Sequence, residues 1–260
     1  MKIVLCVKQV PDTSDIKWTE NNTIQREGLE SITNPYDVYA FESALRLKNK
    51  YGNVSITALT MGPGQAEEML RKFIALGADN GVLLCDKKFA GADTYATGKT
   101  IASAIESKIS DYDLIVCGQF AVDGDTAQTG PSIANFLGIP QVTYVKEILE
   151  YSEGSVLLVR ELDCGVETVR VKLPALICVL DNDFEPTRAT INGIARGQAA
   201  KIERYGIDDI DLGVEQAGLK GSPTYVSKAF RAPQKQVECE FLTSCDDLAH
   251  QIKVCGGLCE

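Results

Sequence analysis

Short apolar runs alternate with longer amphipathic stretches along the first 180 residues of the chain. The apolar runs are rich in β-branched residues and are predicted to be strands, at residues 2–7, 54–60, 81–85, 114–117 and 175–180. The stretches between them are predicted to be helices, at residues 35–50, 64–76, 93–109 and 126–137. Strands that alternate with helices of about 10–15 residues are typical of βαβ units. The pattern therefore predicts an α/β fold with a mostly parallel sheet.

The later part of the chain departs from this alternation. Residues 155–162 and 167–173 are strand-like runs on either side of a short turn, so they predict a β-hairpin that extends one edge of the sheet. Residues 205–224 are rich in turn formers, and residues 243–254 predict one short, capped amphipathic helix. Extensions of this kind are unstable alone, so we expect this part of the chain to pack on its own core, on a domain-swapped copy or on a different subunit.

Composition and charge narrow the class of protein. Of 260 residues, 45% are apolar and 24% are charged, as in ordinary soluble domains. The net charge of −10 repels nucleic acid and anionic membrane surfaces. No apolar stretch approaches the ~20 residues that span a bilayer, and no leader pattern precedes the first strand. We therefore expect a cytoplasmic protein that binds neither nucleic acid nor membrane.

Nine cysteines and one histidine do not indicate a metal site or a nucleophilic catalyst. Cys6, Cys85, Cys117 and Cys178 lie in strand-like runs, where a free thiol behaves as a small apolar side chain. The cysteines of the C-terminal tail match no standard metal-binding spacing. His250 lies in the predicted tail helix, and no Ser/His/Asp or Cys/His set is evident. We expect no catalytic residue and no metal ligand.

Residues 118–130 are the strongest indication of a ligand site. They follow the predicted strand at 114–117 directly and precede a helix that is predicted to begin near Thr126. In an open parallel sheet, ligands bind at the carboxyl ends of strands, where helix N-termini present N–H groups to phosphate. The segment, which predicts a nucleotide phosphate site, reads Gly118, Gln119, Phe120, Ala121, Val122, Asp123, Gly124, Asp125, Thr126, Ala127, Gln128, Thr129 and Gly130.

Other loops after predicted strands favour the same edge of the sheet. Residues Asn34, Pro35, Tyr36 and Asp37 begin the first long helix, with Asn34 as N-cap and Pro35 at the first helical position. Met61 precedes a Gly-Pro-Gly turn that permits close backbone approach. Each loop alone is compatible with plain helix capping, but together they surround one crevice, as an adenine nucleotide requires.

The start of the helix predicted at residues 93–109 contains hydroxyl side chains and a sequence that resembles a P-loop. Asp93 or Thr94 is predicted to cap this helix, and Thr97 lies on its first turn. The Gly98-Lys99-Thr100 sequence resembles the end of a P-loop, but Asp93 stands where that motif requires glycine. The P-loop interpretation therefore fails. The sequence leaves open whether Asp93, Thr94 and Thr97 touch a ligand or only cap the helix.

Several of these segments, in order, resemble the beta subunit of electron-transfer flavoprotein. The resemblance runs from residue 2 to about 205 and is weaker through the tail. It rests on Val7-Lys8-Gln9-Val10-Pro11-Asp12, Asn34-Pro35-Tyr36-Asp37, Ala44-Leu45-Arg46-Leu47-Lys48, Met61-Gly62-Pro63, Leu76-Gly77-Ala78-Asp79, the segment 118–130, and Leu173-Pro174-Ala175.

This resemblance implies a Rossmann-like sheet with helices on both faces and a heterodimer with an alpha subunit that carries FAD. Residues 1–204 are then the nucleotide- and flavin-binding domain, and residues 205–260 form an extended C-terminal arm that packs on the alpha subunit. In the respiratory type of the family, the beta subunit holds a structural AMP. The family's AMP-contacting positions correspond here to Cys6, residues 34–37, Met61 and residues 118–129.

The core of the loop, residues 123–128, is similar instead to the anaerobic, electron-bifurcating type, as are residues 90–94 and 221–224. In that type the beta subunit carries a second FAD, whose AMP portion fills the AMP site. Gly124 permits close approach of a ligand, and Thr126 adds a hydroxyl near the predicted helix start. Ser222, Pro223 and Thr224 supply a turn that we expect to hold the pyrophosphate or ribityl chain, the alternative being a plain solvent loop.

The family resemblance also implies a reaction and partners. NADH delivers a hydride to the FAD of this subunit, which passes one electron to ferredoxin and one to the alpha-subunit FAD. The chain is then an electron-transfer subunit of a flavin-dependent NADH oxidoreductase complex. Residues 183–200 resemble the loop that recognises a partner dehydrogenase, with Ile191 as the anchoring residue and Ile194 nearby. The usual lysine-rich run after this loop is missing, so an acyl-CoA reductase or another flavin dehydrogenase is equally open.

Two alternatives remain open at the level of sequence. The first is a non-bifurcating beta subunit that holds AMP. The second, from another class, is a nucleotide-binding regulator of the universal-stress type, which predicts a homodimer with ATP and no flavin. The identity of the bound nucleotide separates the three hypotheses.

Overall fold

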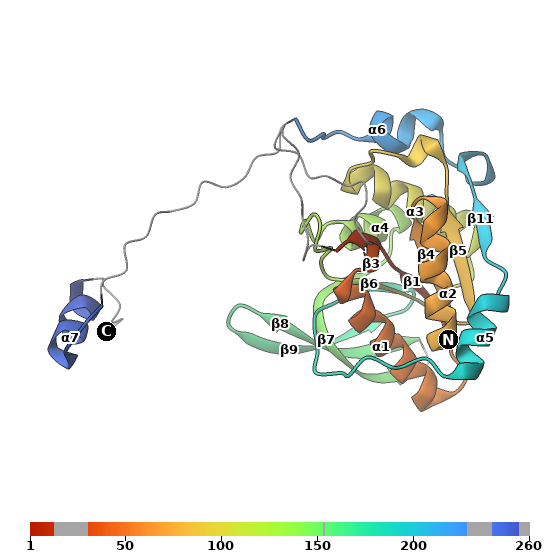
Figure 1. The fold of residues 1–260 in the computed structure, drawn as a ribbon. Coiled ribbons are helices and arrows are strands. Elements are labelled where there is room, and N and C mark those ends of the chain that lie inside the picture. The colour runs from red at the N-terminus through yellow and green to blue at the C-terminus, as the bar shows by residue number, and fades with distance from the viewer. Residues whose placement is uncertain (13–30, 153, 228–240, 255–260) are drawn as a thin grey trace. The chain divides into compact units, whose positions relative to one another are not determined.

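A computed structural model describes residues 1–12, 31–152, 154–227 and 241–254 of the chain. The chain divides into two compact units, residues 1–227 and 228–260. The first unit contains a nine-stranded sheet with helices on both faces, as predicted (Figure 1). The described part of the second unit contains one helix, α7 (Cys245–Val254), at the position of the predicted tail helix.

The parallel part of the sheet confirms the predicted strands. Its members are β1 (Lys2–Cys6), β4 (Ser55–Met61), β5 (Asn80–Leu84), β6 (Leu114–Gly118) and β10 (Ala175–Val179). The strand order across the whole sheet is β11-β5-β4-β1-β6-β10-β7-β8-β9. A short strand that the sequence pattern did not predict, β11 (Glu203–Tyr205), pairs in parallel with β5.

Three strands, not two, form the other end of the sheet. The predicted hairpin is present as β8 (Ser155–Leu162) and β9 (Gly165–Lys172), but it pairs through an additional long strand, β7 (Gln141–Ser152). β7 runs parallel to β10 and antiparallel to β8, with irregular register on both sides. One residue of β7, Tyr144, has a φ of 59°, a left-handed conformation that is unusual for an aromatic residue. This irregularity interrupts the period-2 pattern and explains why β7 was not predicted.

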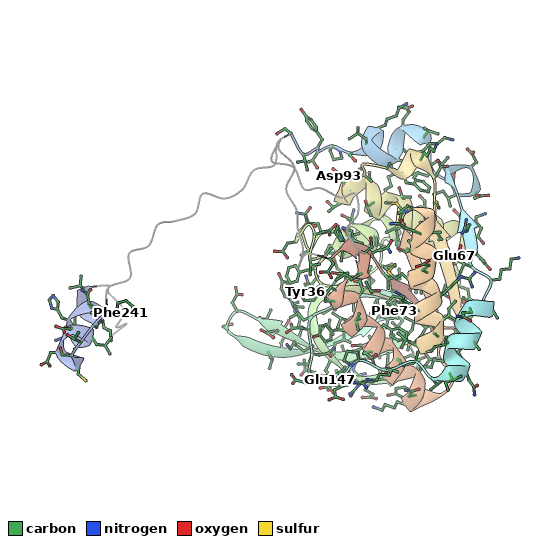
Figure 2. All side chains as sticks on the ribbon, viewed as in Figure 1. Tyr36, Glu67, Phe73, Asp93, Glu147 and Phe241 are labelled. Carbon is green, nitrogen blue, oxygen red and sulfur yellow. The ribbon has the colours of Figure 1, made fainter. Side chains whose placement is uncertain are left out.

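Two helices pack on each face of the parallel strands. They are α1 (Pro35–Tyr51) and α2 (Glu67–Leu76) on one face, and α3 (Thr94–Lys108) and α4 (Thr129–Leu137) on the other (Figure 1). In β1, the side chains of Ile3 and Leu5 join the α1 and α2 core, whereas Val4 between them joins the α3 and α4 core. This alternation follows from the two-residue period of a strand. Phe73 of α2 lies within the first of these cores (Figure 2).

The first unit also includes most of the turn-rich segment after β11. This segment contains three single-turn elements, η4 (Ile207–Asp209), η5 (Val214–Gln216) and α6 (Gly218–Gly221). Ile207, Ile210 and Leu212 are buried against the α3 face, so residues 205–227 belong to the compact α/β unit. None of the described helices is long and apolar enough to cross a membrane.

Four short elements complete the fold around these layers. η2 (Gly64–Ala66) precedes α2, and η3 (Lys87–Phe89) follows β5. A separate two-stranded sheet pairs β2 (Gln9–Pro11) with β3 (Ser31–Thr33). Both strands of this small sheet lie between the end of β1 and the start of α1 along the chain. They bring Lys8 and Asn34 together, because the Asn34 amide donates to the Lys8 carbonyl at 2.9 Å.

Candidate functional site

The order of the parallel strands locates the most favourable place for a ligand. From β1 the chain proceeds to β4 and β5 on one side, and later to β6 and β10 on the other. The order reverses between β1 and β6, whose last residues are Cys6 and Gly118. Ligands of open α/β sheets bind at the carboxyl ends of the strands on either side of such a reversal. The predicted loop at residues 118–130 begins at this point.

Asn34 joins this loop to the start of α1. Its side-chain amide donates to the Phe120 carbonyl at 2.7 Å and to Asp37 Oδ1 at 3.0 Å. Its side-chain oxygen accepts from the Val122 amide at 3.2 Å. Asn34 therefore occupies the predicted N-cap position but makes no capping bond to α1. Its side chain instead fixes the backbone on both sides of Ala121.

Asp37 is buried at the junction of β1, α1 and β6. Its Oδ2 accepts from the Lys8 amide at 2.6 Å. Burial raises the pKa of the Asp37 carboxyl to about 7, against the opposing effect of hydrogen bonds from Asn34, Lys8 and Gly118 and of the Lys8 charge. A Cβ at Gly118 would lie 2.4 Å from Asp37 Oδ1, so only glycine fits there. Asp37 is thus a structural residue beneath the loop.

The loop continues three residues further than the sequence predicted. α4 begins at Thr129, not near Thr126, so Thr126 belongs to the loop. The reason is backbone conformation, since Asp125 and Ala127 have φ values of 50° and 54° and cannot lie in a right-handed helix. The amides of Gly124 and Asp125 both donate to the Ala121 carbonyl, which forms a turn at the tip of the loop.

The N-terminus of α4 lies against the strand ends, and no side chain caps it in the described part of the chain. A Cβ at Gly130 would lie 2.4 Å from the Cys178 sulfur on β10, so glycine allows this close contact. Among the described residues, the side chain of the N-cap residue Gln128 makes no capping bond, and the first turn holds no acidic residue. Free amides at a helix N-terminus are favourable donors to phosphate.

The start of α3 is arranged differently. The Asp93 side chain caps the helix by accepting from the Ala96 amide at 2.9 Å, as predicted. The same carboxylate accepts from the Thr224 amide at 3.0 Å and the Thr224 hydroxyl at 2.7 Å. The Asp93 amide donates to the Ser222 hydroxyl at 2.8 Å. Burial opposes ionisation of Asp93, but the bonds from Ala96 and Thr224 outweigh it and lower its pKa.

These contacts bring most of the predicted site residues together. The turn that contains Pro223 lies at the start of α3, and the Thr94 hydroxyl is 3.3 Å from Gln128 Oε1 beside α4. Cys6 and Met61 lie at the ends of the adjacent strands β1 and β4. Thr97 is on the first turn of α3, where its amide donates to the Asp93 carbonyl. The structure therefore gathers loops from β1, β4, β5 and β6 at one edge of the sheet.

The false P-loop has a packing role. Gly98, Lys99 and Thr100 lie inside α3, and a Cβ at Gly98 would be 2.5 Å from the Ser132 Cβ on α4. The Thr100 hydroxyl donates to the Ala96 carbonyl one turn earlier. Gly98 therefore allows α3 and α4 to approach closely, which confirms that this motif is not a phosphate loop.

Sequence reasoning missed one residue that supports the loop. The Tyr144 amide donates to Gln119 Oε1 at 2.7 Å, and the Gln119 side chain is buried. The Tyr144 ring packs edge-on against Phe120, which packs in turn against Tyr36, with centroid separations of 6.1 and 5.3 Å. No pattern in the sequence indicates this contact, because the left-handed bulge in β7 produces it.

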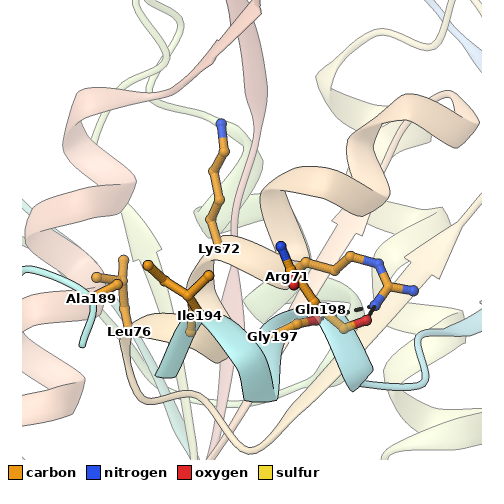
Figure 3. Close-up of a pocket in the computed structure, with 8 residues that line it drawn as sticks. Arg71, Lys72, Leu76, Ala189, Ile194, Gly197 and Gln198 are labelled. Atoms are coloured by element: carbon orange, nitrogen blue, oxygen red, sulfur yellow. Dashed lines mark hydrogen bonds between the residues drawn. The ribbon is translucent and has the colours of Figure 1, made fainter. Parts of the chain in front are cut away.

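The segment predicted to recognise a partner forms α5 (Ile191–Ala199), which packs on α2 (Figure 3). Cβ atoms at Gly193 and Gly197 would lie 2.2 and 2.4 Å from carbonyl oxygens of α2, so both glycines allow close helix packing. Arg71 of α2 donates to three carbonyls at the end of α5. Ile194 and Gly197 line a pocket of about 410 Å³ between the helices.

The segment that precedes α5 is anchored to α1. The buried Glu42 carboxylate accepts from the amide and hydroxyl of Thr187, at 2.7 and 2.8 Å. The Arg46 guanidinium lies 3.4 Å from the centre of the Phe184 ring. With this support, Ile191 is 86% exposed and Ile194 is 47% exposed. The predicted recognition residues therefore lie on the surface of a well-anchored helix.

Comparison with known proteins gives a consistent result along most of the chain. A family model described as the electron transfer flavoprotein domain matches residues 21–210. The acryloyl-CoA reductase electron transfer subunit gamma of Anaerotignum propionicum is 45% identical over 244 residues, 91% of each chain. Subunit CarD of the caffeyl-CoA reductase-Etf complex of Acetobacterium woodii is 41% identical over 236 residues, 90% of this chain and 89% of CarD. The electron transfer flavoprotein subunit beta of Megasphaera elsdenii is 42% identical over 241 residues, with the same coverage.

Proposed function

The chain belongs to the electron transfer flavoprotein family, and we propose that it is a beta subunit that binds the adenine nucleotide portion of FAD between the loop at residues 119–128 and the start of α4. The observation that carries this proposal is the uncapped N-terminus of α4 at the point where the strand order reverses. That combination of free amides and position is what a nucleotide phosphate requires.

The residues at this edge fit the group. Apart from the two neighbouring residues, no described residue has an atom within 4 Å of a Cβ built at Gly124, so the tip of the loop has room for a ligand to approach. The amides at the start of α4 would hold a phosphate, and Asn34 would keep the loop backbone in place beside it. Ser222 and Thr224, held at the start of α3, would line the far side of a dinucleotide. When bound, FAD would accept a hydride from NADH and supply one electron each to ferredoxin and the alpha-subunit flavin.

The neighbourhood of the site also supports a particular assembly. We propose an alpha subunit as the stable partner, contacted by residues 228–260, the part of the expected C-terminal arm that lies outside the compact α/β unit. Support comes from α7, in which the apolar side chains of Leu248 and Ile252 are one turn apart and so lie on one face. A helix of about ten residues is marginal alone, which favours packing on another chain.

A second partner would dock on α5. We propose that Ile191 and Ile194 contact a flavin-dependent dehydrogenase or acyl-CoA reductase, because both are exposed apolar side chains on a rigid helix. The names of two relatives, which refer to acryloyl-CoA and caffeyl-CoA reductase systems, support the second class. An Ile191→Asp variant should lose electron transfer to the partner at least tenfold while it keeps its nucleotide. Glu185→Asp, a conservative change on the same segment, is the matched control.

One observation favours the alternative of a structural AMP. Thr224, which the FAD hypothesis assigns to the pyrophosphate or ribityl chain, donates from its amide and its hydroxyl to the Asp93 carboxylate. A mononucleotide would leave these bonds unchanged. The universal-stress alternative is not supported, because the family match places the chain in another class.

Analysis of the nucleotides in the purified complex tests the proposal. The chain is co-expressed with an alpha subunit of the family, and nucleotides are released by heat and separated chromatographically. Two FAD molecules per heterodimer, together with NADH-dependent reduction of ferredoxin that requires the second acceptor, support the bifurcating beta subunit. One FAD and one AMP per heterodimer would contradict the bifurcating beta subunit and support the non-bifurcating one. Absence of any adenine nucleotide from this subunit would contradict both hypotheses.

A further inference from the structure

The candidate site has an unusual charge balance for a phosphate ligand. The predicted site residues include four acidic side chains, of which Asp93, Asp123 and Asp125 lie outside the buried junction that holds Asp37, and no lysine or arginine. The chain as a whole has a net charge of −10. A nucleotide phosphate that approaches this edge is therefore repelled unless a nearby cation compensates the carboxylates. Lys8 lies in the loop after the first predicted strand, but it is not among the predicted site residues.

Lys8 supplies a positive charge next to the acidic residues of the site. It follows β1 by two residues, and its Nζ lies 2.6 and 2.8 Å from the two carboxylate oxygens of Asp123. Asp123 lies in the turn at the tip of the phosphate loop, between Ala121 and Asp125. The ion pair therefore spans the reversal point, from the end of β1 to the loop after β6. The Lys8 charge also acts on the buried Asp37 carboxyl.

The backbone of Lys8 is held independently of its side chain. Its amide donates to Asp37 Oδ2 at 2.6 Å, and its carbonyl accepts from the Asn34 amide at 2.9 Å. A change in the side chain leaves both bonds available. The side chain is half exposed, at 49%, and that of Asp123 is 28% exposed. An exposed ion pair of this kind adds little to folding stability, so its position at the loop tip needs another explanation.

We propose that Lys8 is a positioning residue of the nucleotide site, which holds the tip of the phosphate loop through Asp123 and neutralises that carboxylate so that an anionic nucleotide can bind beside it. This inference rests on the proposed function of the same edge. In this proposal Lys8 does not contact the phosphate directly. It acts through its ion pair with Asp123. Without Lys8, the Asp123 charge is left uncompensated next to the ligand phosphate.

A double-mutant cycle in the co-expressed complex tests this inference. After removal of endogenous nucleotide, the Kd for AMP is measured by calorimetry for the wild type, Lys8→Met, Asp123→Asn and the double variant. We expect Lys8→Met to weaken AMP binding about tenfold and Asp123→Asn to change it less than about threefold. The double variant should recover most of the lost affinity, because the uncompensated charge is gone. The loss in Lys8→Met should shrink as ionic strength rises.

A second ion pair, at the opposite end of β1, provides the matched control. Lys2 pairs with Asp111 at the amino end of β1, far along the strand from the site, and both side chains are largely exposed. Lys2→Met should leave the Kd for AMP unchanged. Thermal unfolding of each variant distinguishes a change in binding from loss of the fold.

The possible results separate the inference from the function on which it rests. If the wild type binds AMP but Lys8→Met binds it equally well, the inference is wrong and the function stands. If Lys8→Met is weakened and the double variant is weakened equally, Lys8 contacts the phosphate directly and its action through Asp123 is wrong. If the wild type binds neither AMP nor FAD, both the function and the inference fail.

Discussion

Two helices, α3 and α4, begin a short distance apart at the same edge of the sheet. A side chain of the protein caps the N-terminus of α3, and no described side chain caps that of α4. The first amides of α3 face the Asp93 carboxylate, which also holds Thr224. The first amides of α4 face no capping side chain among the described residues, and Gly130 allows the helix to contact the strand ends directly. The α3 terminus is neutralised by the protein itself, whereas the α4 terminus is available to an external anion.

This difference shows that a helix N-terminus after a parallel strand is not sufficient to identify a phosphate site. Both α3 and α4 satisfy that description, and both carry hydroxyl residues in the first turn. They differ in whether a carboxylate of the protein already accepts hydrogen bonds from the first amides of the helix. Ser222 and Thr224 reinforce the internal arrangement at α3, while Asn34 supports the loop beside α4 without approaching its amides.

Replacement of Gly130 should have the largest effect, because it displaces the α4 terminus. In Gly130→Val the new Cβ would overlap the Cys178 sulfur, so we expect roughly 2–3 kcal/mol of destabilisation and about a hundredfold loss of nucleotide affinity. Urea unfolding and calorimetry measure the two quantities. Gly124→Ala is the control, because its Cβ meets no described atom within 4 Å and stability should be unchanged. Full nucleotide affinity in Gly130→Val would argue against α4 as the phosphate site.

Removal of Asn34 should loosen the loop without moving α4. Asn34→Ala loses the bonds to Phe120, Val122 and Asp37, and it leaves buried polar groups without partners. We expect a stability loss of about 2 kcal/mol and an affinity loss of ten- to a hundredfold. Asn49→Ala, an exposed change on the same helix, should alter neither quantity. Equal affinity in the Asn34 variant would show that the loop does not take part in binding.

The buried Asp37 carboxyl should make the stability of this junction depend on pH. Its pKa is raised from 3.8 to about 7 in the folded protein, so the folded state binds more protons than the unfolded state between these values. Its contribution to stability is therefore complete below about pH 4 and is lost as the pH rises through 7. Urea unfolding at pH 5 and pH 8 should show lower stability at pH 8. In Asp37→Asn this component should disappear, and an unchanged pH dependence in that variant would assign it to other groups.

Removal of the internal cap on α3 should have the smallest effect and should decide between the two ligands. Asp93→Ala should cost about 1 kcal/mol as a lost helix cap, measured by urea unfolding. AMP affinity should change less than about threefold, because the α4 terminus is untouched. FAD affinity should fall further if Ser222 and Thr224 hold the second half of a dinucleotide. Equal effects on AMP and FAD would favour the mononucleotide.

The helix starts show how far local sequence signals extend. Pro35 and Asp93 marked the starts of α1 and α3 correctly, because each acts within its own turn of helix. The start of α4 was placed three residues too early, because alanine rarely adopts the left-handed backbone conformation that Ala127 has in the structure. It arises from the turn around Ala121, which Asn34 stabilises from a distant part of the chain.

Strand signals were reliable where a run is buried on both faces and weak where it is not. The parallel strands in the centre of the sheet read as apolar runs, so the α/β class was evident from periodicity. β11 is only three residues long, and β7 changes partners at a bulge, so neither has a regular pattern. Both strands depend on neighbours that come from other parts of the chain.

The order of strands and helices, the buried character of the central strands and the glycine-rich loop after β6 can all be read from the amino-acid sequence, because they depend on local periodicity and residue size. The contacts of Ser222 and Thr224 with the start of α3, the ion pair between Lys8 and Asp123, and the contacts of Asn34 and Tyr144 with the loop depend on folding. They join residues 25 to more than 100 positions apart, and only the packed sheet brings their polar atoms within hydrogen-bonding distance.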